Sequence, residues 1–274
     1  MDISRASPHL RLRSVVRSFE ERRLEPGAAT LTWPVAARPH LILNIHLAES
    51  YRVRIDGGPL GRTPETGIVG PQTHRRAHVH MTGSIHVFNI LFQPTGLHRL
   101  VGIDMRTLID QDPSARDVVG ASAVGLGDAV RAAPDFTGRV AAAQTWLGMM
   151  MEARGPDPAI DRASSLLVAE RGHPRVDALV RQSGLSASRL QRRFALRVGM
   201  TPKLFARTVR FDAALVARRN DPSRTWTDIV HDLGYFDQAH FIRECRAFAG
   251  LPPSSLVGEW ENVFFPAGDQ KIQA

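Results

Sequence analysis

The C-terminal third of the chain contains an internal repeat with an offset of 51 residues. Ser186 and Asp237 occupy equivalent positions, and both are residue types that accept hydrogen bonds from the free N–H groups at the start of a helix. The other matched pairs have similar chemistry in both copies: Leu190 and Phe241, Arg192 and Arg243, Gly199 and Gly250, Pro202 and Pro253, and Phe205 and Leu256. The repeat therefore predicts two copies of one supersecondary unit.

Each copy predicts a short amphipathic helix, a glycine turn and a second, capped helix. The turn contains Gly184 in the first copy and Gly234 in the second copy, where it is one residue longer. This is the layout of a helix-turn-helix, which presents its second helix to the major groove of DNA. A helical hairpin can also be purely structural, but caps, glycines and apolar anchors in register favour the helix-turn-helix. Residues 202–219 are expected to form a rigid helix that sets the distance between the two units.

The exposed face of each second helix supplies the candidate DNA contacts. Arg can bind guanine with two hydrogen bonds, and Gln can bind adenine in the same way. The candidate base contacts point away from the apolar anchors and are Ser188, Gln191, Arg192, Gln238, His240 and Arg243. The candidate phosphate contacts are Arg189, Arg193, Thr201, Lys203 and Arg246.

The charge of the chain is concentrated in the same region. Residues 160–258 hold 16 Arg and Lys against 9 Asp and Glu, whereas the remainder holds 19 against 18. A basic excess confined to one module is typical of a protein with a polyanion partner, here double-stranded DNA. The alternative is a solvated basic face that binds nothing.

The rest of the chain predicts a β-rich domain with trailing helices. Short β-prone runs lie at 29–33, 41–47, 51–55, 67–69, 77–81 and 85–92, and helical patterns follow at 96–101, 115–130 and 136–153. After a Gly-Pro break at 155–156, helices are expected at 160–170, 176–182, 187–197, 202–219, 225–232 and 238–249. We expect an α+β multidomain chain: a β-rich sensor or dimerisation domain, residues 1–155, built as a small barrel or sandwich, and an all-α DNA-binding domain, residues 159–260.

Over residues 160–258 the sequence resembles the AraC/XylS family of transcription regulators. The resemblance rests on residues 176–194 with Gly199-Met-Thr-Pro202, on residues 226–243 with Gly250-Leu-Pro-Pro253, and on the linker-helix run 209–215. It implies base contacts by Ser188, Gln191, Arg192, Gln238 and Arg243. Two positions depart from the family pattern: Ser188 is small where a bulkier reader is common, and Cys245 replaces an aromatic residue. The N-terminal part is similar to the cupin-like domain that often precedes this module, which implies effector binding or homodimerisation, and RNA polymerase as a partner of an activator.

Other functions are weighed against this interpretation. The N-terminal half is rich in histidine, including residues 40, 46, 74, 78, 80 and 86. Convergence of His78, His80 and His86 would indicate a metal-dependent enzyme fused to a DNA reader. An apolar cavity would indicate a ligand-gated regulator, and a filled barrel with an apolar outer patch a constitutive binder that only dimerises. No carboxylate completes a metal site, so we expect no metal, cofactor or catalytic residue. The single cysteine and the absence of long apolar runs predict a cytoplasmic protein without membrane spans.

Overall fold

Two antiparallel sheets make up the N-terminal part of the computed structural model, which describes residues 2–25, 31–75, 77–151 and 155–260. The five-stranded sheet has the order β1 (Asp2–Ala6), β2 (Val16–Leu24), β9 (Ile85–Phe92), β4 (Ile42–His46) and β7 (Thr66–Val69). The four-stranded sheet has the order β3 (Leu31–Val35), β8 (Ala77–Met81), β5 (Arg52–Ile55) and β6 (Leu60–Arg62). Strands occur at all six predicted runs, although residues 29 and 30 of the first run lie outside the described ranges, whereas β1, β2 and β6 were not predicted.

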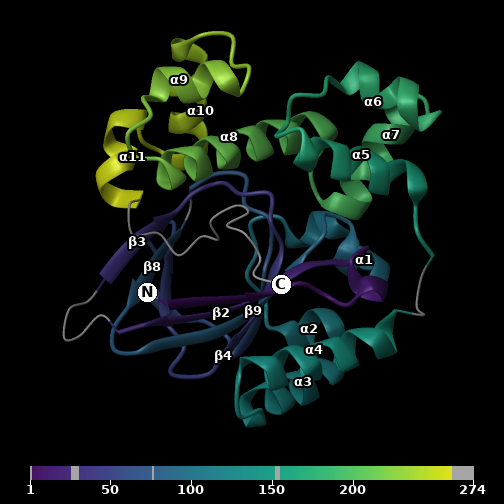
Figure 1. The fold of residues 1–274 in the computed structure, drawn as a ribbon, viewed down its shortest axis with the longest axis vertical. Coiled ribbons are helices and arrows are strands. Elements are labelled where there is room, and N and C mark those ends of the chain that lie inside the picture. Colours follow the sequence, from purple (N-terminus) through teal and green to yellow (C-terminus); the bar gives the residue numbers. More distant parts are fainter. Residues whose placement is uncertain (1, 26–30, 76, 152–154, 261–274) are drawn as a thin grey trace.

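The helices of the N-terminal part cover the five-stranded sheet (Figure 1). They are α1 (Gly96–Val101), α2 (Ala115–Val119), α3 (Ser122–Ala132) and α4 (Phe136–Met150), with two 3-10 turns, η1 (Leu10–Leu12) and η2 (Met105–Leu108). The expected helical segment 115–130 is two helices, because Gly120 ends α2 with a φ of 89°. The last residues of the expected helix 136–153 lie outside the described ranges. Leu126 of α3 and Leu147 of α4 join Phe88 in one apolar core.

Seven helices make up the C-terminal part of the described chain. They are α5 (Pro158–Ala169), α6 (Val176–Ser183), α7 (Ala187–Val198), α8 (Pro202–Asn220), α9 (Trp226–Asp232), α10 (Gln238–Ala249) and α11 (Pro253–Trp260). The six predicted helices are confirmed, and α11 is additional. None of the helices in the described ranges is long and apolar enough to cross a membrane.

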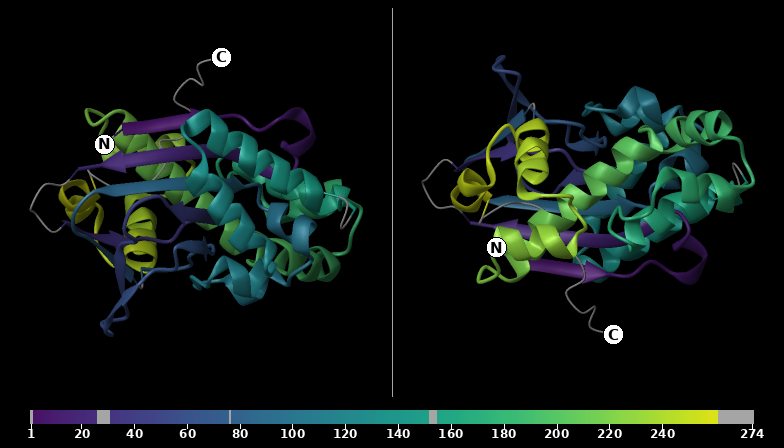
Figure 2. Two further views of the ribbon diagram at one scale, coloured as in Figure 1. Left: turned by 90° about the horizontal axis from the view of Figure 1, so that it is seen from below. Right: turned by 90° about the horizontal axis from the view of Figure 1, so that it is seen from above.

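Helix α8 connects two separate helical groups. Figure 1 shows α8 above the sheets, with α5, α6 and α7 at one end and α9, α10 and α11 at the other, and the view from above in Figure 2 shows the same rod crossing the molecule. Each group has its own apolar core, centred on Phe194 and Phe205 in the first and on Phe211 and Phe241 in the second. The expected fold class, a β-rich domain followed by an all-α region, is confirmed.

Two segments of the β domain touch the helical groups. Ala36 and Ala37, which follow β3, are buried in the core of the second group, and the Ala37 N–H donates to the Phe248 carbonyl at 2.9 Å. Near η2, Ile109 packs against the core of the first group. His40 Nε2 also lies 3.0 Å from Asp212 Oδ2 on α8, so the connecting helix itself is tied to the β domain.

Candidate nucleic-acid interface

The first unit, which we define as α6 and α7, has the geometry expected from the repeat. Gly184 makes the turn with a φ of +67°, a left-handed conformation that a side chain would strain. The Ser186 hydroxyl accepts a hydrogen bond from the Arg189 N–H at 3.4 Å and so caps α7. Leu190 and Phe194 are completely buried, and their positions fix which face of α7 is turned to solvent.

The second unit, α9 and α10, repeats this construction with stronger caps. Thr225 and Asp228 form a reciprocal capping box at the start of α9. The Asp237 carboxylate accepts from the His240 N–H at 2.6 Å and caps α10. Phe241 is completely buried between Trp226 and Tyr235, with ring centroids at 5.2 and 5.1 Å. The anchor of the second unit is thus an aromatic cluster instead of a leucine.

The candidate base contacts are mostly exposed. Ser188, Gln191 and Arg192 project to solvent from α7, and Gln238 and Arg243 project from α10. His240 is the exception, because its ring is half-buried against Tyr235 at 5.3 Å and lies 3.6 Å from Glu244. The structure therefore leaves five of the six side chains accessible to a partner and holds the sixth partly against its own unit.

The candidate phosphate contacts divide into two groups. Arg189, Lys203 and Arg246 are exposed, whereas Thr201 is half-buried and its hydroxyl caps α8 by accepting from the Leu204 N–H at 3.3 Å. Arg193 is held by an ion pair, with Nη2 2.6 Å from Asp157 Oδ2.

Asp157 holds the first unit against α5. Its carboxylate is buried, and the same oxygen lies 2.9 Å from Arg197 Nε. Two guanidinium groups therefore form ion pairs with one buried carboxylate, which compensates the cost of removing the charge from water. Arg193 thus serves the packing of α7 in this structure, a role that residue spacing alone did not reveal.

Two arginines of α8 connect this helix to the second unit and to the loop that precedes the first unit. Arg207 Nε donates to Glu244 Oε1 of α10 at 2.7 Å, and Arg210 Nη2 donates to the Gly172 carbonyl near the first unit at 2.7 Å. A helix of 19 residues is about 28 Å long. That length is of the same order as the ~34 Å between successive turns of the major groove on one face of a duplex.

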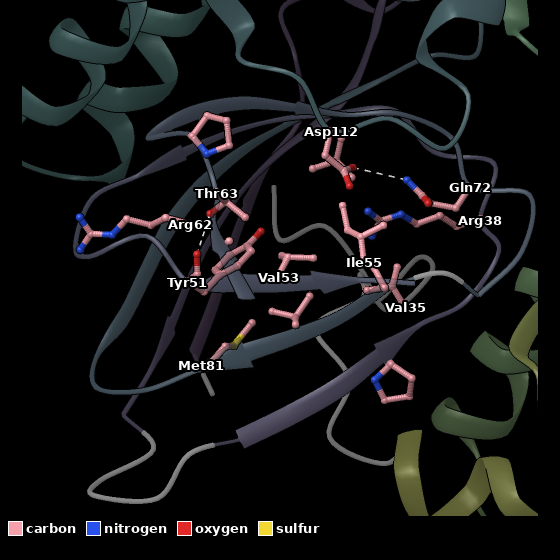
Figure 3. A pocket seen from close by; sticks show the side chains of 16 residues that line it. Val35, Arg38, Tyr51, Val53, Ile55, Arg62, Thr63, Gln72, Met81 and Asp112 are labelled. Carbon is pink, nitrogen blue, oxygen red and sulfur yellow. Dashed lines mark hydrogen bonds between the residues drawn. The ribbon is translucent and has the colours of Figure 1, made fainter. Parts of the chain in front are cut away.

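A cavity of about 180 Å³ lies in the β domain (Figure 3). Apolar side chains of β5 and β8 form its wall, among them Val53, Ile55, Val79 and Met81. Polar side chains gather at one end, where Gln72 Nε2 donates to Asp112 Oδ1 at 3.4 Å beside Arg38. Burial raises the pKa of Tyr51, which also lines the cavity, to about 12, so its hydroxyl stays protonated.

The N-terminal histidines are engaged in separate contacts. His46 Nε2 lies 3.2 Å from the Thr63 hydroxyl, His80 Nδ1 3.0 Å from the Thr32 hydroxyl, and His86 Nε2 2.7 Å from Glu21. Within the described ranges, no three His, Cys, Asp or Glu residues are arranged to hold a metal ion. His78, His80 and His86 accordingly do not form a cluster.

Cys245 packs inside the second unit. It is completely buried in the core with Phe241 and Phe248, and burial raises the pKa of its thiol. A protonated, inaccessible thiol is a poor nucleophile, so Cys245 acts as a small apolar core residue.

Two family models match this chain, one in each part. The family model of a helix-turn-helix domain matches residues 179–258, and the model of a domain of unknown function, DUF6597, matches residues 4–114. No curated protein matches the chain.

Solved structures with a similar fold include ToxT from Vibrio cholerae. ToxT of strain O395 is 10% identical, with a TM-score of 0.49 over 89% of this chain and 99% of that chain. ToxT of strain SCE256, solved with a bound unsaturated fatty acid, is 12% identical, with a TM-score of 0.45 over 89% and 95%.

Two capped helix-turn-helix units joined by one rigid helix define a DNA-binding protein. Residues 179–258 are a helix-turn-helix domain of the type that AraC/XylS regulators carry, and a β domain precedes it.

Proposed function

We propose that α7 and α10 enter successive major grooves on one face of a DNA duplex. Ser188, Gln191 and Arg192 contact bases in one half of the operator, and Gln238, His240 and Arg243 contact bases in the other half. The observation that carries this proposal is the equivalent placement of Arg192 and Arg243, both exposed six residues after a helix cap. Arg189, Thr201, Lys203 and Arg246 contact phosphates, and Arg193 joins them only if it leaves Asp157.

The two arginines provide the direct test of this proposal. The full-length protein selects its preferred sequence from random DNA, and binding of that operator is then measured for Arg192→Ala and Arg243→Ala. Each substitution is expected to cost about 1–3 kcal/mol and to relax base preference in a different half of the site. Arg116→Ala, an exposed arginine on α2, is the control and leaves affinity unchanged. Unchanged affinity and base preference in both variants would refute the assignment.

We further propose that residues 1–155 form a sensor domain that binds a compact effector in the cavity. A cavity of about 180 Å³ is slightly larger than the ~150 Å³ engineered cavity that holds benzene. The apolar wall suits a small apolar body, and the polar end suits one hydrogen-bonding group. Because Arg38 and Asp112 carry opposite charges at that end, an uncharged ligand fits better than an anion.

Residues that line the cavity are close in sequence to residues that pack against each of the two helical groups. Pro34, Val35 and Arg38 line it, while Ala36 and Ala37 between them lie in the core of the second group. On the other side Asp112 lines it, three residues after Ile109, which packs on the first group. A ligand that displaces either wall would move the segment on which one unit is docked. Effector binding would thus change the relative placement of α7 and α10.

Small aromatic probes test the sensor proposal. Phenol, benzyl alcohol and benzoate are compared for their effect on thermal stability and on operator affinity. Phenol or benzyl alcohol is expected to raise the Tm and to change the affinity, and benzoate to act less. Val79→Trp, which fills the cavity, abolishes the response, whereas Val124→Trp on the exposed face of α3 retains it. An equal response of the Val79→Trp variant would exclude this cavity, and a Tm shift without a change in affinity would favour a constitutive binder.

A further inference from the structure

Phe236 is the most exposed large apolar residue in the part of the chain that the structure describes, with 91% of its surface accessible. It lies in the turn between α9 and α10, directly before the cap residue Asp237. A single exposed apolar side chain does not by itself mark a binding surface. The significance of Phe236 lies in its location, next to the start of a recognition helix.

The repeat explains why Phe236 points outward. Its counterpart in the first unit, one residue before the cap Ser186, is Leu185, which packs partly buried against its own core. The turn of the second unit is one residue longer, and Tyr235 occupies the inward position, 6% exposed. The extra residue therefore leaves Phe236 without a place in the core of its own unit.

The backbone around Phe236 is firmly held. The Tyr235 ring packs against Phe241, and the Arg210 guanidinium lies 5.5 Å from the Tyr235 ring centre. On the other side, the Asp237 carboxylate caps α10. Phe236 is thus presented from a fixed turn, so that little backbone entropy is lost when it contacts a partner.

We propose that Phe236 contacts the C5 methyl group of a thymine at the edge of the second half-site. This inference rests on the proposed placement of α10 in the major groove. In helix-turn-helix proteins the N-terminal end of the recognition helix lies closest to the base edges, and Phe236 precedes that end. An aromatic side chain has no hydrogen bond to offer a base, but it forms an apolar contact with the thymine methyl group, the one apolar group that the major groove displays.

Deoxyuridine substitution isolates this contact, because it removes the methyl group and changes no hydrogen-bonding atom of the base. The wild-type protein first selects its operator from random DNA. Each thymine of the second half-site is then replaced in turn, and affinity is measured for wild-type protein and for Phe236→Ala. We expect one position at which wild-type affinity falls about fourfold, the value for burial of one methyl group. Phe236→Ala binds thymine and uracil equally at that position.

Two controls separate this inference from the proposed function. Arg243→Ala is expected to lose affinity for the same operator but to retain the response to uracil. Met149→Ala, which removes a side chain 72% exposed on α4, behaves as wild type. If Arg243→Ala weakens binding while Phe236→Ala still loses affinity when thymine is replaced by uracil, the thymine contact is wrong and the assignment of α10 to the major groove stands. Normal DNA binding by Phe236→Ala, with loss only of transcription in a reconstituted assay, would also overturn it and indicate a protein partner.

Discussion

His46 is a buried imidazole in β4, with 2% of its surface accessible. Its ring lies edge-on to Tyr51, with centroids 4.7 Å apart, and its Nε2 faces the Thr63 hydroxyl. Burial lowers the pKa of His46 from 6.5 to about 4, because a protonated ring would lose its hydration without gaining a carboxylate partner. The folded state therefore requires a neutral ring at this position.

The free energy of unfolding is expected to depend on pH through this ring. Between pH 6.5 and about 4, the unfolded chain binds a proton at His46 that the folded chain does not bind. The contribution of His46 is thus complete above pH 6.5 and is lost as the pH falls toward 4, with a total of about 3 kcal/mol. Urea unfolding at pH 7, 5.5 and 4 checks this on wild-type protein and His46→Gln.

The difference between the two proteins is the informative quantity, because carboxylates titrate equally in both. We expect the wild type to lose more stability than His46→Gln toward pH 4. His231→Gln, at a position 91% exposed, follows the wild type. Parallel curves for wild type and His46→Gln would show that the ring is protonated in the folded state.

At the scale of elements, helix ends in the C-terminal part were predictable and several strands were not. The helices were predictable because cap residues and glycines are local signals, and the predicted bounds of α10 are those observed. Strand β2 has Glu20, Glu21 and Arg22 in its buried middle. Arg22 pairs with Glu20 within the strand, and Glu21 pairs with the distant Arg139 at 2.9 Å. A prediction that expects buried strands to be runs of apolar residues therefore misses β2.

Alanine substitutions at the two glycines that flank α7 separate the effect of backbone strain from the effect of packing against the β domain. Gly184 and Gly199 both have positive φ, +67° and +92°, so an alanine at either position is expected to cost about 1–2 kcal/mol of stability. An added Cβ meets nothing at Gly184, whereas at Gly199 it would lie 2.8 Å from the Met105 carbonyl oxygen and 2.7 Å from Ile109 Cδ1. Gly199→Ala is therefore expected to cost at least ~1 kcal/mol more, the range for overpacking.

Chemical denaturation and limited proteolysis measure this difference. Gly184→Ala is the matched control, because it carries the strain without the collision. Faster cleavage after residue 198 in Gly199→Ala alone would show that the first unit has separated from η2. Equal effects of the two substitutions would mean that the contact between α7 and η2 does not hold the first unit in place.

At the scale of the whole molecule, the basic module could be predicted from the sequence, but its contacts with the β domain could not. The excess of arginine and the repeat are visible in the chain itself. The contact of His40 with Asp212 joins residues 172 positions apart, and no local pattern pairs them. Burial acts to raise the pKa of Asp212, but His40, Arg17 and Arg219 outweigh it and the pKa is lowered, so the carboxylate stays charged between the domains. The candidate contact residues could be named from the sequence and stay a prediction, whereas the contacts between their module and the β domain could not be predicted.

The salt dependence of DNA binding reports the charge that the whole module brings to the phosphates. Each cation that neutralises a phosphate contributes about −0.9 to the slope of log affinity against log salt. Arg189, Lys203 and Arg246 are exposed, so the expected slope is about −3 or steeper. Arg193 adds nothing while it remains on Asp157, whose buried carboxylate would otherwise lose one of its two partners.

Two substitutions resolve these contributions in operator binding between 50 and 200 mM salt, a range in which phosphate contacts are sensitive. Lys203→Ala is expected to reduce the magnitude of the slope by about 1. Arg193→Ala leaves the slope unchanged and lowers the free energy of unfolding, because Arg193 acts on packing. A slope that becomes shallower in Arg193→Ala would show that this residue leaves Asp157 to bind phosphate. A slope near zero in the wild-type protein would mean that the basic surface does not meet DNA at all.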